Sequence, residues 1–122
     1  MYTVSQVALL AGVAAHTVRY YDERGLLVGV SRDAASYRIF DEEALTWFRL
    51  VVLLRACGVP LQDIEECVAF MSRGEDDAGR CRDMLEGFKH VLVGKAHEID
   101  EMVGVLERMI KRRTSDTGAE EA

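Results

Sequence analysis

The chain has 122 residues, of which 49% are hydrophobic and 30% charged, and it contains a single proline. This length suits one compact domain with an appendage and excludes two independent cores of ordinary size, and the composition favours a mainly helical protein. The net charge of −6 argues against nucleic-acid binding only if it is spread evenly. Residues 1–60 hold six Arg and six acidic residues, whereas residues 61–122 hold nine Lys or Arg and fifteen acidic residues. The first half is therefore neutral, and its clustered arginines can still bind phosphate.

No apolar run approaches the roughly 18–20 residues that a membrane span needs, and the N-terminus lacks the basic-then-apolar pattern of a secretory signal. We therefore expect a cytoplasmic protein with no membrane partner. The three cysteines, Cys57, Cys67 and Cys81, are an odd number without a C-x-x-C pair. This spacing favours reduced thiols over a disulfide framework.

Two short helices are expected first. Thr3 and Gln6 form a capping box for a helix that Gly12 ends. A second helix over about 14–24 is closed by Gly25. Their expected inward-facing residues are Val7, Leu10 and Ala11 in the first helix, and Val18 and Tyr21 in the second. Two short helices joined by a tight turn predict a helix-turn-helix.

A small hairpin, or wing, should follow. The segment 28–36 carries Gly29, Ser31, Asp33 and Ser36 and is typical of a loop. It separates Leu26-Leu27 from Tyr37–Phe40, and both are short enough to be strands.

Two longer helices come next. Asp41 caps the third helix, which Gly58 ends, and Pro60 opens the fourth, which ends near Gly74. The expected buried faces consist of Leu45, Phe48, Val51 and Val52 in the third helix, and Leu61, Ile64, Val68 and Met71 in the fourth. The acidic, glycine-bounded stretch 74–79 is the best candidate for a linker.

A heptad pattern then runs through the expected helix at 80–111. Its positions are Leu85, Phe88, Leu92, Lys95, Ile99, Met102, Leu106 and Met109. Seven of the eight are apolar, a narrow stripe that the small first domain is too short to cover, so we expect it to pair with a second copy in a homodimer. The polar tail at 112–122 should be disordered.

These elements, in this order, resemble the MerR family of transcription regulators over nearly the whole chain. The matching stretches are 2–8 with Gly12-Val13, 17–26, 37–40, 54–61 with Ile64, and the last helix with its Lys95 break. The resemblance implies a mainly α fold: a winged helix-turn-helix at 1–73 with a small β wing, and a C-terminal helix that forms an antiparallel coiled coil as dimer interface. It also implies binding to palindromic promoter DNA. Family members typically bend and untwist an overlong promoter spacer so that RNA polymerase, an indirect partner, can use it.

Candidate DNA contacts follow from chemistry and from the resemblance. Arg19 suits phosphate or guanine, and Tyr20 combines an apolar ring with a hydroxyl. Thr17 shares their side of the helix. Tyr21 is also a candidate contact, although it fits the core better because it shares a helix face with Val18. The matching family positions suggest that Tyr37, Arg38 and Arg55 lie near DNA, and Arg32 is within reach from the loop.

No cofactor or metal is expected. Cys81 matches a position where metal-sensing members place a thiolate, but no Cys or His follows Ile110. A metal site at Cys81, with His90 or His97, therefore stays an alternative, as does a redox-responsive thiol. A small-molecule or redox effector is possible but not identified. A docking module of winged-helix type without sequence-specific DNA reading is the alternative function, and the scattered histidines argue against an enzyme.

Overall fold

The computed structural model describes residues 1–73 and 78–121. The chain divides into two compact units, Met1–Phe88 and Lys89–Ala122. Residues 74–77 of the proposed linker lie outside the described residues, and Ala78 and Gly79 already belong to the last helix. None of the helices among the described residues is both long enough and apolar enough to cross a membrane.

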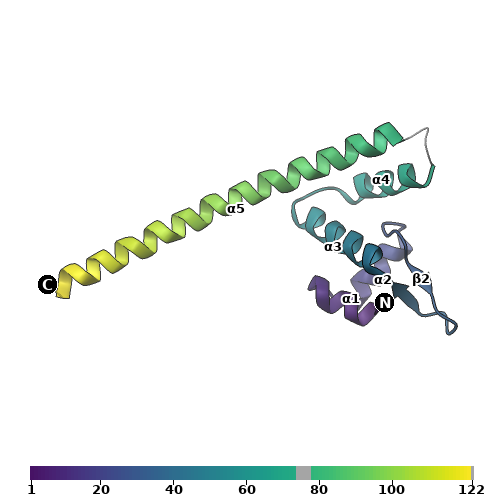
Figure 1. Ribbon diagram of the computed structural model, residues 1–122, viewed down its shortest axis with the longest axis horizontal. Coiled ribbons are helices and arrows are strands. Elements are labelled where there is room, and N and C mark those ends of the chain that lie inside the picture. Colours follow the sequence, from purple (N-terminus) through teal and green to yellow (C-terminus); the bar gives the residue numbers. More distant parts are fainter. Residues whose placement is uncertain (74–77, 122) are drawn as a thin grey trace. The chain divides into compact units, whose positions relative to one another are not determined.

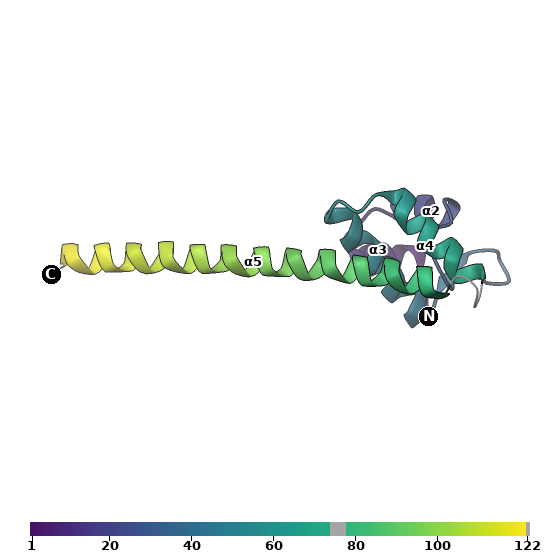
Figure 2. The ribbon, with the colours of Figure 1, turned by 90° about the horizontal axis from the view of Figure 1, so that it is seen from above.

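The described residues form eight elements in chain order (Figure 1). They are β1 (Tyr2–Thr3), α1 (Val4–Ala11), α2 (Ala15–Glu23), β2 (Ser31–Arg32), β3 (Arg38–Phe40), α3 (Glu42–Ala56), α4 (Leu61–Arg73) and α5 (Ala78–Glu121). The helix-turn-helix is confirmed, because α1 and α2 pack together across a three-residue turn (Figure 1). Helix α5 is a single unbroken helix (Figure 2). The capping box is confirmed too. The Gln6 amide donates to Thr3 Oγ1 over 3.2 Å, and the Thr3 amide donates to Gln6 Oε1 over 2.9 Å.

The sheet differs from the expected two-stranded hairpin. Its three antiparallel strands lie in the order β1-β3-β2, so the chain's first residues pair with the wing. The prediction of a strand at Leu26-Leu27 was wrong. Leu26 is buried and follows the turn that closes α2: its amide donates to the carbonyl of Tyr21, and its own carbonyl accepts a 2.8 Å bond from Trp47 Nε1. Strand β1 escaped prediction because two residues are too short to show alternation.

One core cluster joins α1, α2, β3 and α3 through Val7, Ala8, Val18, Phe40, Ala44, Leu45 and Phe48. Leu10 was expected in it but is exposed. Helical periodicity explains the error: Val4, Val7, Ala8 and Ala11 lie at i, i+3, i+4 and i+7 and share the inward face, from which position 10 is rotated away.

The third and fourth helices agree with prediction at their starts. Asp41 caps α3, since its Oδ1 accepts a 2.8 Å bond from the amide of Ala44. The buried face of α4 is formed by Ile64, Cys67 and Phe70, whereas Met71 is exposed, contrary to prediction. Helical periodicity alone places Met71, at i+7 from Ile64, on this face and Phe70 beside it. Phe70 is in contact with the first turns of α5, where the guanidinium of Arg80 lies 5.8 Å from its ring centroid.

Helix α5 is longer than expected. It continues through residues 112–121, where disorder was expected, because residues 112–117 contain neither proline nor glycine. The boundary between the two units falls inside this helix rather than at the proposed linker. Phe88 explains that position: its side chain is only 8% exposed, so the first turns of α5 pack into the first unit.

Candidate nucleic-acid interface

A groove of about 440 Å³ lies between the start of α1, helix α2 and the wing, which comprises residues 31–40. Its lining consists of Thr3, Val4, Ser5, Arg19, Arg32, Asp33, Ser36, Tyr37 and Arg38. Four of the eight side chains predicted to bind DNA therefore meet here: Arg19, Arg32, Tyr37 and Arg38. Sequence reasoning missed the other five lining residues, Thr3, Val4, Ser5, Asp33 and Ser36. The capping box had already marked the helix N-terminus that brings Thr3 and Ser5 to the groove.

Helix α2 carries one of the exposed cations of the groove, Arg19. Val18 is fully buried, which anchors the helix and leaves Arg19 and Tyr20 on the exposed side, with Thr17 half-buried. The Tyr20 hydroxyl accepts a 3.0 Å bond from Arg24, whose guanidinium lies 5.8 Å from the ring centroid of Tyr20. Arg24 also pairs with Glu65 of α4, and this partner raises the pKa of Arg24 further above its ordinary value. Tyr20 is thus held in place.

Tyr21 belongs to the core, as expected. Its ring is half-buried against the main cluster, with its centroid 6.1 Å from that of Phe48. This packing holds the end of α2 against α3.

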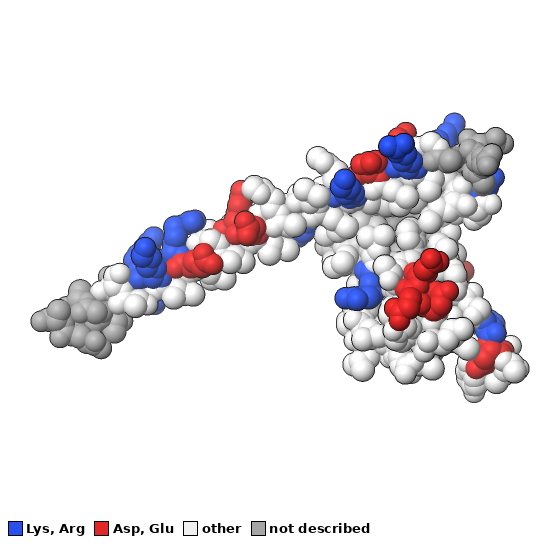
Figure 3. All heavy atoms as spheres, in the orientation of Figure 1, with Lys and Arg blue, Asp and Glu red and all other residues white. Residues whose placement is uncertain are grey.

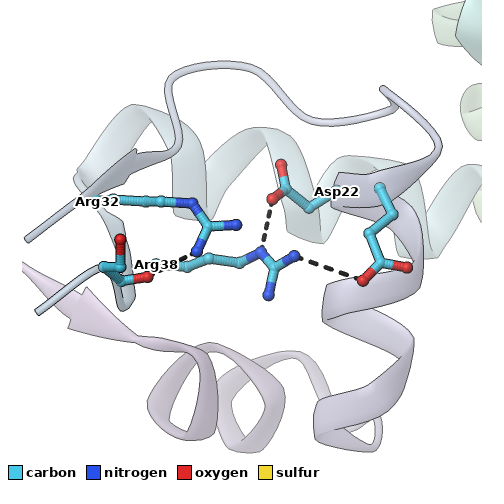
Figure 4. Close-up of polar contacts among 5 residues, drawn as sticks. Asp22, Arg32 and Arg38 are labelled. Carbon is cyan, nitrogen blue, oxygen red and sulfur yellow. Dashed lines mark hydrogen bonds and ion pairs between the residues drawn. The ribbon is translucent and has the colours of Figure 1, made fainter.

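Arg38 is engaged within the chain (Figure 4). Its Nε donates to Asp22 Oδ2 over 2.7 Å, and its Nη2 lies 3.6 Å from Glu23 Oε1. The Arg38 side chain is 14% exposed and that of Asp22 is 25% exposed. The ion pair ties the wing to the end of α2, and contact of Arg38 with DNA stays a prediction.

Arg32 stands directly opposite Arg38 in the sheet register. Like charges in this position destabilise a pair of strands, and the carboxylate of Asp22 offsets the charge of Arg38. Arg32 itself stays exposed and donates a 2.6 Å bond to the carbonyl of Ser36 (Figure 4).

The tip of the wing is ordered by Asp33. Its Oδ1 accepts bonds from the amides of Ala35 and Tyr37, at 3.0 and 2.9 Å, and this fixes a tight turn. Ser36 completes the turn with a φ of 67°, in the left-handed region. This hydrogen-bonded turn therefore holds the exposed ring of Tyr37 and the exposed guanidinium of Arg32 in place.

Arg55 does not line the groove. Its Nη1 donates a 2.8 Å bond to the carbonyl of Val59, and its Nε is buried without a partner among the described residues. The side chain therefore braces the turn between α3 and α4. The glycine and proline at 58 and 60 were the sequence signal that such a turn follows directly.

The heptad positions of α5 are mostly exposed. Leu85, Ile99, Met102, Leu106 and Met109 are exposed, and Leu92 is half-buried. Phe88 is the exception, because it is already buried within its own chain and offers no surface to a partner. On the face shown in Figure 3, positive and negative side chains both occur along α5. An apolar stripe on a helix with both charge signs is the pattern of a coiled coil.

The cysteines form no metal centre in the described part of the chain, where no group of three or more His, Cys, Asp or Glu could hold a metal. All three thiols are free, with Cys67 buried and Cys57 and Cys81 half-buried.

A helix-turn-helix with a two-stranded wing, and arginines from both in one groove, defines a winged helix-turn-helix protein of the DNA-binding class. The model of the MerR HTH family regulatory proteins matches residues 2–70, more than half of the chain. The chain belongs to this family.

Relatives agree with that assignment. An uncharacterised HTH-type transcriptional regulator of Haemophilus influenzae is 36% identical over 75 residues, covering 62% of this chain and 56% of that protein. The HTH-type transcriptional activator TipA of Streptomyces coelicolor is 27% identical over 113 residues, covering 93% of this chain and 42% of TipA. The chain thus spans about half the length of these curated relatives. They are named as regulators, which agrees with the expectation that this protein is not an enzyme.

Among solved structures, HiNmlR, a MerR family regulator lacking the sensor domain, bound to promoter DNA, aligns with a TM-score of 0.69 and 28% identity. The alignment covers 89% of this chain and 86% of HiNmlR. A putative MerR family transcriptional regulator from Listeria monocytogenes aligns over all of both chains, with a TM-score of 0.68 and 20% identity, and supports the fold alone.

Proposed function

We propose that this protein is a homodimeric transcriptional regulator that binds a palindromic promoter site. The groove carries the proposal, because it joins an exposed arginine of α2 to an exposed arginine and tyrosine of the wing. Membership of the family supports the proposal, as does the likeness to a regulator described as bound to promoter DNA. A cytoplasmic location follows from the same proposal.

The groove residues divide the work. Arg19, with Thr17 and Tyr20 beside it, enters the major groove and reads base edges, since a guanidinium pairs well with guanine. Arg32 and Tyr37 contact flanking phosphates, which add affinity without sequence preference. The N-terminus of α1 faces the same groove and adds amide donors and a favourable dipole for phosphate. Arg38 and Arg55 act on DNA indirectly, by holding the wing and the α3–α4 turn.

The stripe of α5 sets the spacing between two such grooves. Its members from Leu92 onward pair with the same stripe of a second copy in an antiparallel coiled coil. If the fixed distance between the two DNA-binding domains does not match the distance between the two half-sites on straight DNA, binding requires distortion of the promoter spacer. Smooth bending of a site costs on the order of 1–6 kcal/mol, which phosphate contacts can offset. RNA polymerase then uses the distorted promoter, so it is an indirect partner.

The test starts from a random library of duplex DNA, from which the full chain selects its own site. Arg19→Ala is then compared with Arg49→Ala, an exposed arginine of α3 outside the groove. Arg19→Ala should weaken binding to the selected site by about 1–3 kcal/mol and binding to random DNA by less. Arg49→Ala should leave both nearly unchanged.

Two results would count against the proposal. An equal loss for selected and random DNA would show that Arg19 does not read bases. If the unmodified chain enriches no sequence and binds no duplex even at low salt, the alternative of a protein-docking module takes its place.

A further inference from the structure

The junction of α4 and α5 holds two thiols that the DNA-binding groove does not use. Cys67 lies on the buried face of α4, fully enclosed, and Cys81 lies half-buried in the first turns of α5. The two helices are in contact there, since the guanidinium of Arg80 lies 5.8 Å from the ring centroid of Phe70. Cys67 and Cys81 lie on either side of this contact, close enough for Cys81 to influence the Cys67 thiol.

The two thiols differ in chemistry. Burial, together with the charge and the hydrogen bond of Cys81, raises the pKa of Cys67 to about 12. Cys67 is therefore a protonated, enclosed thiol, inert towards an oxidant in solution. Cys81 is the more accessible of the pair, and accessible thiols react first.

We propose that Cys67 and Cys81 are an oxidisable pair that closes to an intrachain disulfide when a peroxide reaches Cys81. The Cys81 sulfur attacks hydrogen peroxide, which forms an S–O bond, breaks the O–O bond and releases one water. The Cys67 sulfur then attacks the sulfenic acid, which forms the S–S bond and releases a second water. The two thiols lose two electrons and two protons in total, and the peroxide is reduced to two waters.

The first oxidation prepares the second. The charge of the Cys81 thiolate contributes to the raised pKa of Cys67. A neutral sulfenic acid at Cys81 removes that contribution, so Cys67 gives up its proton more readily once its neighbour has reacted. The order of events, Cys81 before Cys67, follows from accessibility and from this coupling.

The cross-link would act on the helix that carries the dimer stripe. A disulfide holds its two Cα atoms about 4.4–6.8 Å apart, so oxidation sets how the first turns of α5 rest on α4. This step rests on the proposed function: a change in how α5 packs on α4 alters the spacing of the two DNA-binding domains and therefore the affinity for the promoter site. The disulfide thus makes the regulator responsive to oxidation, with peroxides as the class of effector.

The experiment treats the reduced full chain with hydrogen peroxide and analyses it by intact mass and peptide mapping without reductant. The unmodified protein and the control variant Cys57→Ser should lose the mass of two hydrogen atoms and yield a peptide that joins the Cys67 and Cys81 segments. Dithiothreitol should reverse both changes. Cys67→Ala and Cys81→Ser should each abolish the joined peptide. Cys67→Ala avoids placing a hydroxyl in the core, and circular dichroism is used to check that this variant folds.

Outcomes other than the Cys67–Cys81 peptide overturn the pair. They include a disulfide to Cys57, a disulfide between chains, or further oxidation of Cys81 without a cross-link. Binding of the selected DNA is measured on the same samples, where oxidation should change affinity by about fivefold or more. A cross-link without a change in affinity refutes the regulatory role alone, whereas a reduced protein that binds no DNA refutes the proposed function and leaves the thiol chemistry standing.

Discussion

The ion pair between Arg38 and Asp22 decides whether the wing arginine touches DNA or positions the wing. Asp22→Asn keeps the shape of the side chain and its ability to accept a hydrogen bond, and removes only its charge. A bond to a charged group contributes about 1.5–3 kcal/mol, roughly twice as much as a neutral bond. With the two side chains 14% and 25% exposed, solvent screens the pair only in part, so the substitution should cost about 1 kcal/mol of unfolding free energy.

That loss is measurable by thermal unfolding. For a domain of 60–100 residues, 1 kcal/mol corresponds to a fall in Tm of about 4–8 °C. The matched control is Glu23→Gln, because Glu23 lies next to Asp22 and carries the same charge but is 3.6 Å from Arg38 and mostly exposed. An exposed pair contributes little, so the control should shift Tm by much less.

DNA affinity then separates the two roles of Arg38. Both substitutions remove a negative charge near the groove, which by itself favours phosphate binding. Glu23→Gln should therefore bind DNA slightly more tightly. Asp22→Asn should bind more weakly, by up to about fivefold if the full 1 kcal/mol of lost order has to be restored on binding. If Asp22→Asn leaves Tm unchanged and strengthens binding as Glu23→Gln does, Arg38 pairs with phosphate and the positioning role is wrong.

Two further predictions concern the dimer stripe and the wing tip. Ile99→Glu should give monomers in sedimentation, because a buried glutamate in the seam costs several kcal/mol. The control is Val93→Glu, which should leave the dimer intact. Val93 is as exposed in the single chain as Ile99 (58% against 57%) but lies one residue past heptad position 92. Dissociation of both variants alike would show that the stripe is not the interface. Ser36→Gly should raise the unfolding free energy by about 0.5–1 kcal/mol, since glycine relieves the left-handed φ of 67°, and Ala35→Gly should lower it. The same sign for both substitutions in denaturant titrations would disprove strain at Ser36.

Local signals in the sequence were sufficient for most of the helical framework. The capping box of Thr3 and Gln6 and the cap at Asp41 were predicted and are present. Such features depend on neighbours three or four residues away, which is the range over which helix geometry acts. The heptad of α5 is equally local, and it marked the exposed stripe with the exception of Phe88.

Features that depend on distant partners escaped the sequence. Strand β1 exists because Tyr2 and Thr3 meet Phe40 and Ile39, and Phe88 is buried because α5 packs into the first unit. The partner of Arg38 was missed for the same reason, because Asp22 lies sixteen residues earlier in the chain.

The sequence alone therefore determined the family, the order of the helices and the residues that carry charge to the groove. Only the tertiary structure decided which of those charges are available. Arg19 and Arg32 remain exposed, whereas the guanidinium of Arg38 is held by carboxylates of α2. The physical reason is that the pairing of a charge depends on distances between elements far apart in the chain, and a local pattern contains no information on those distances.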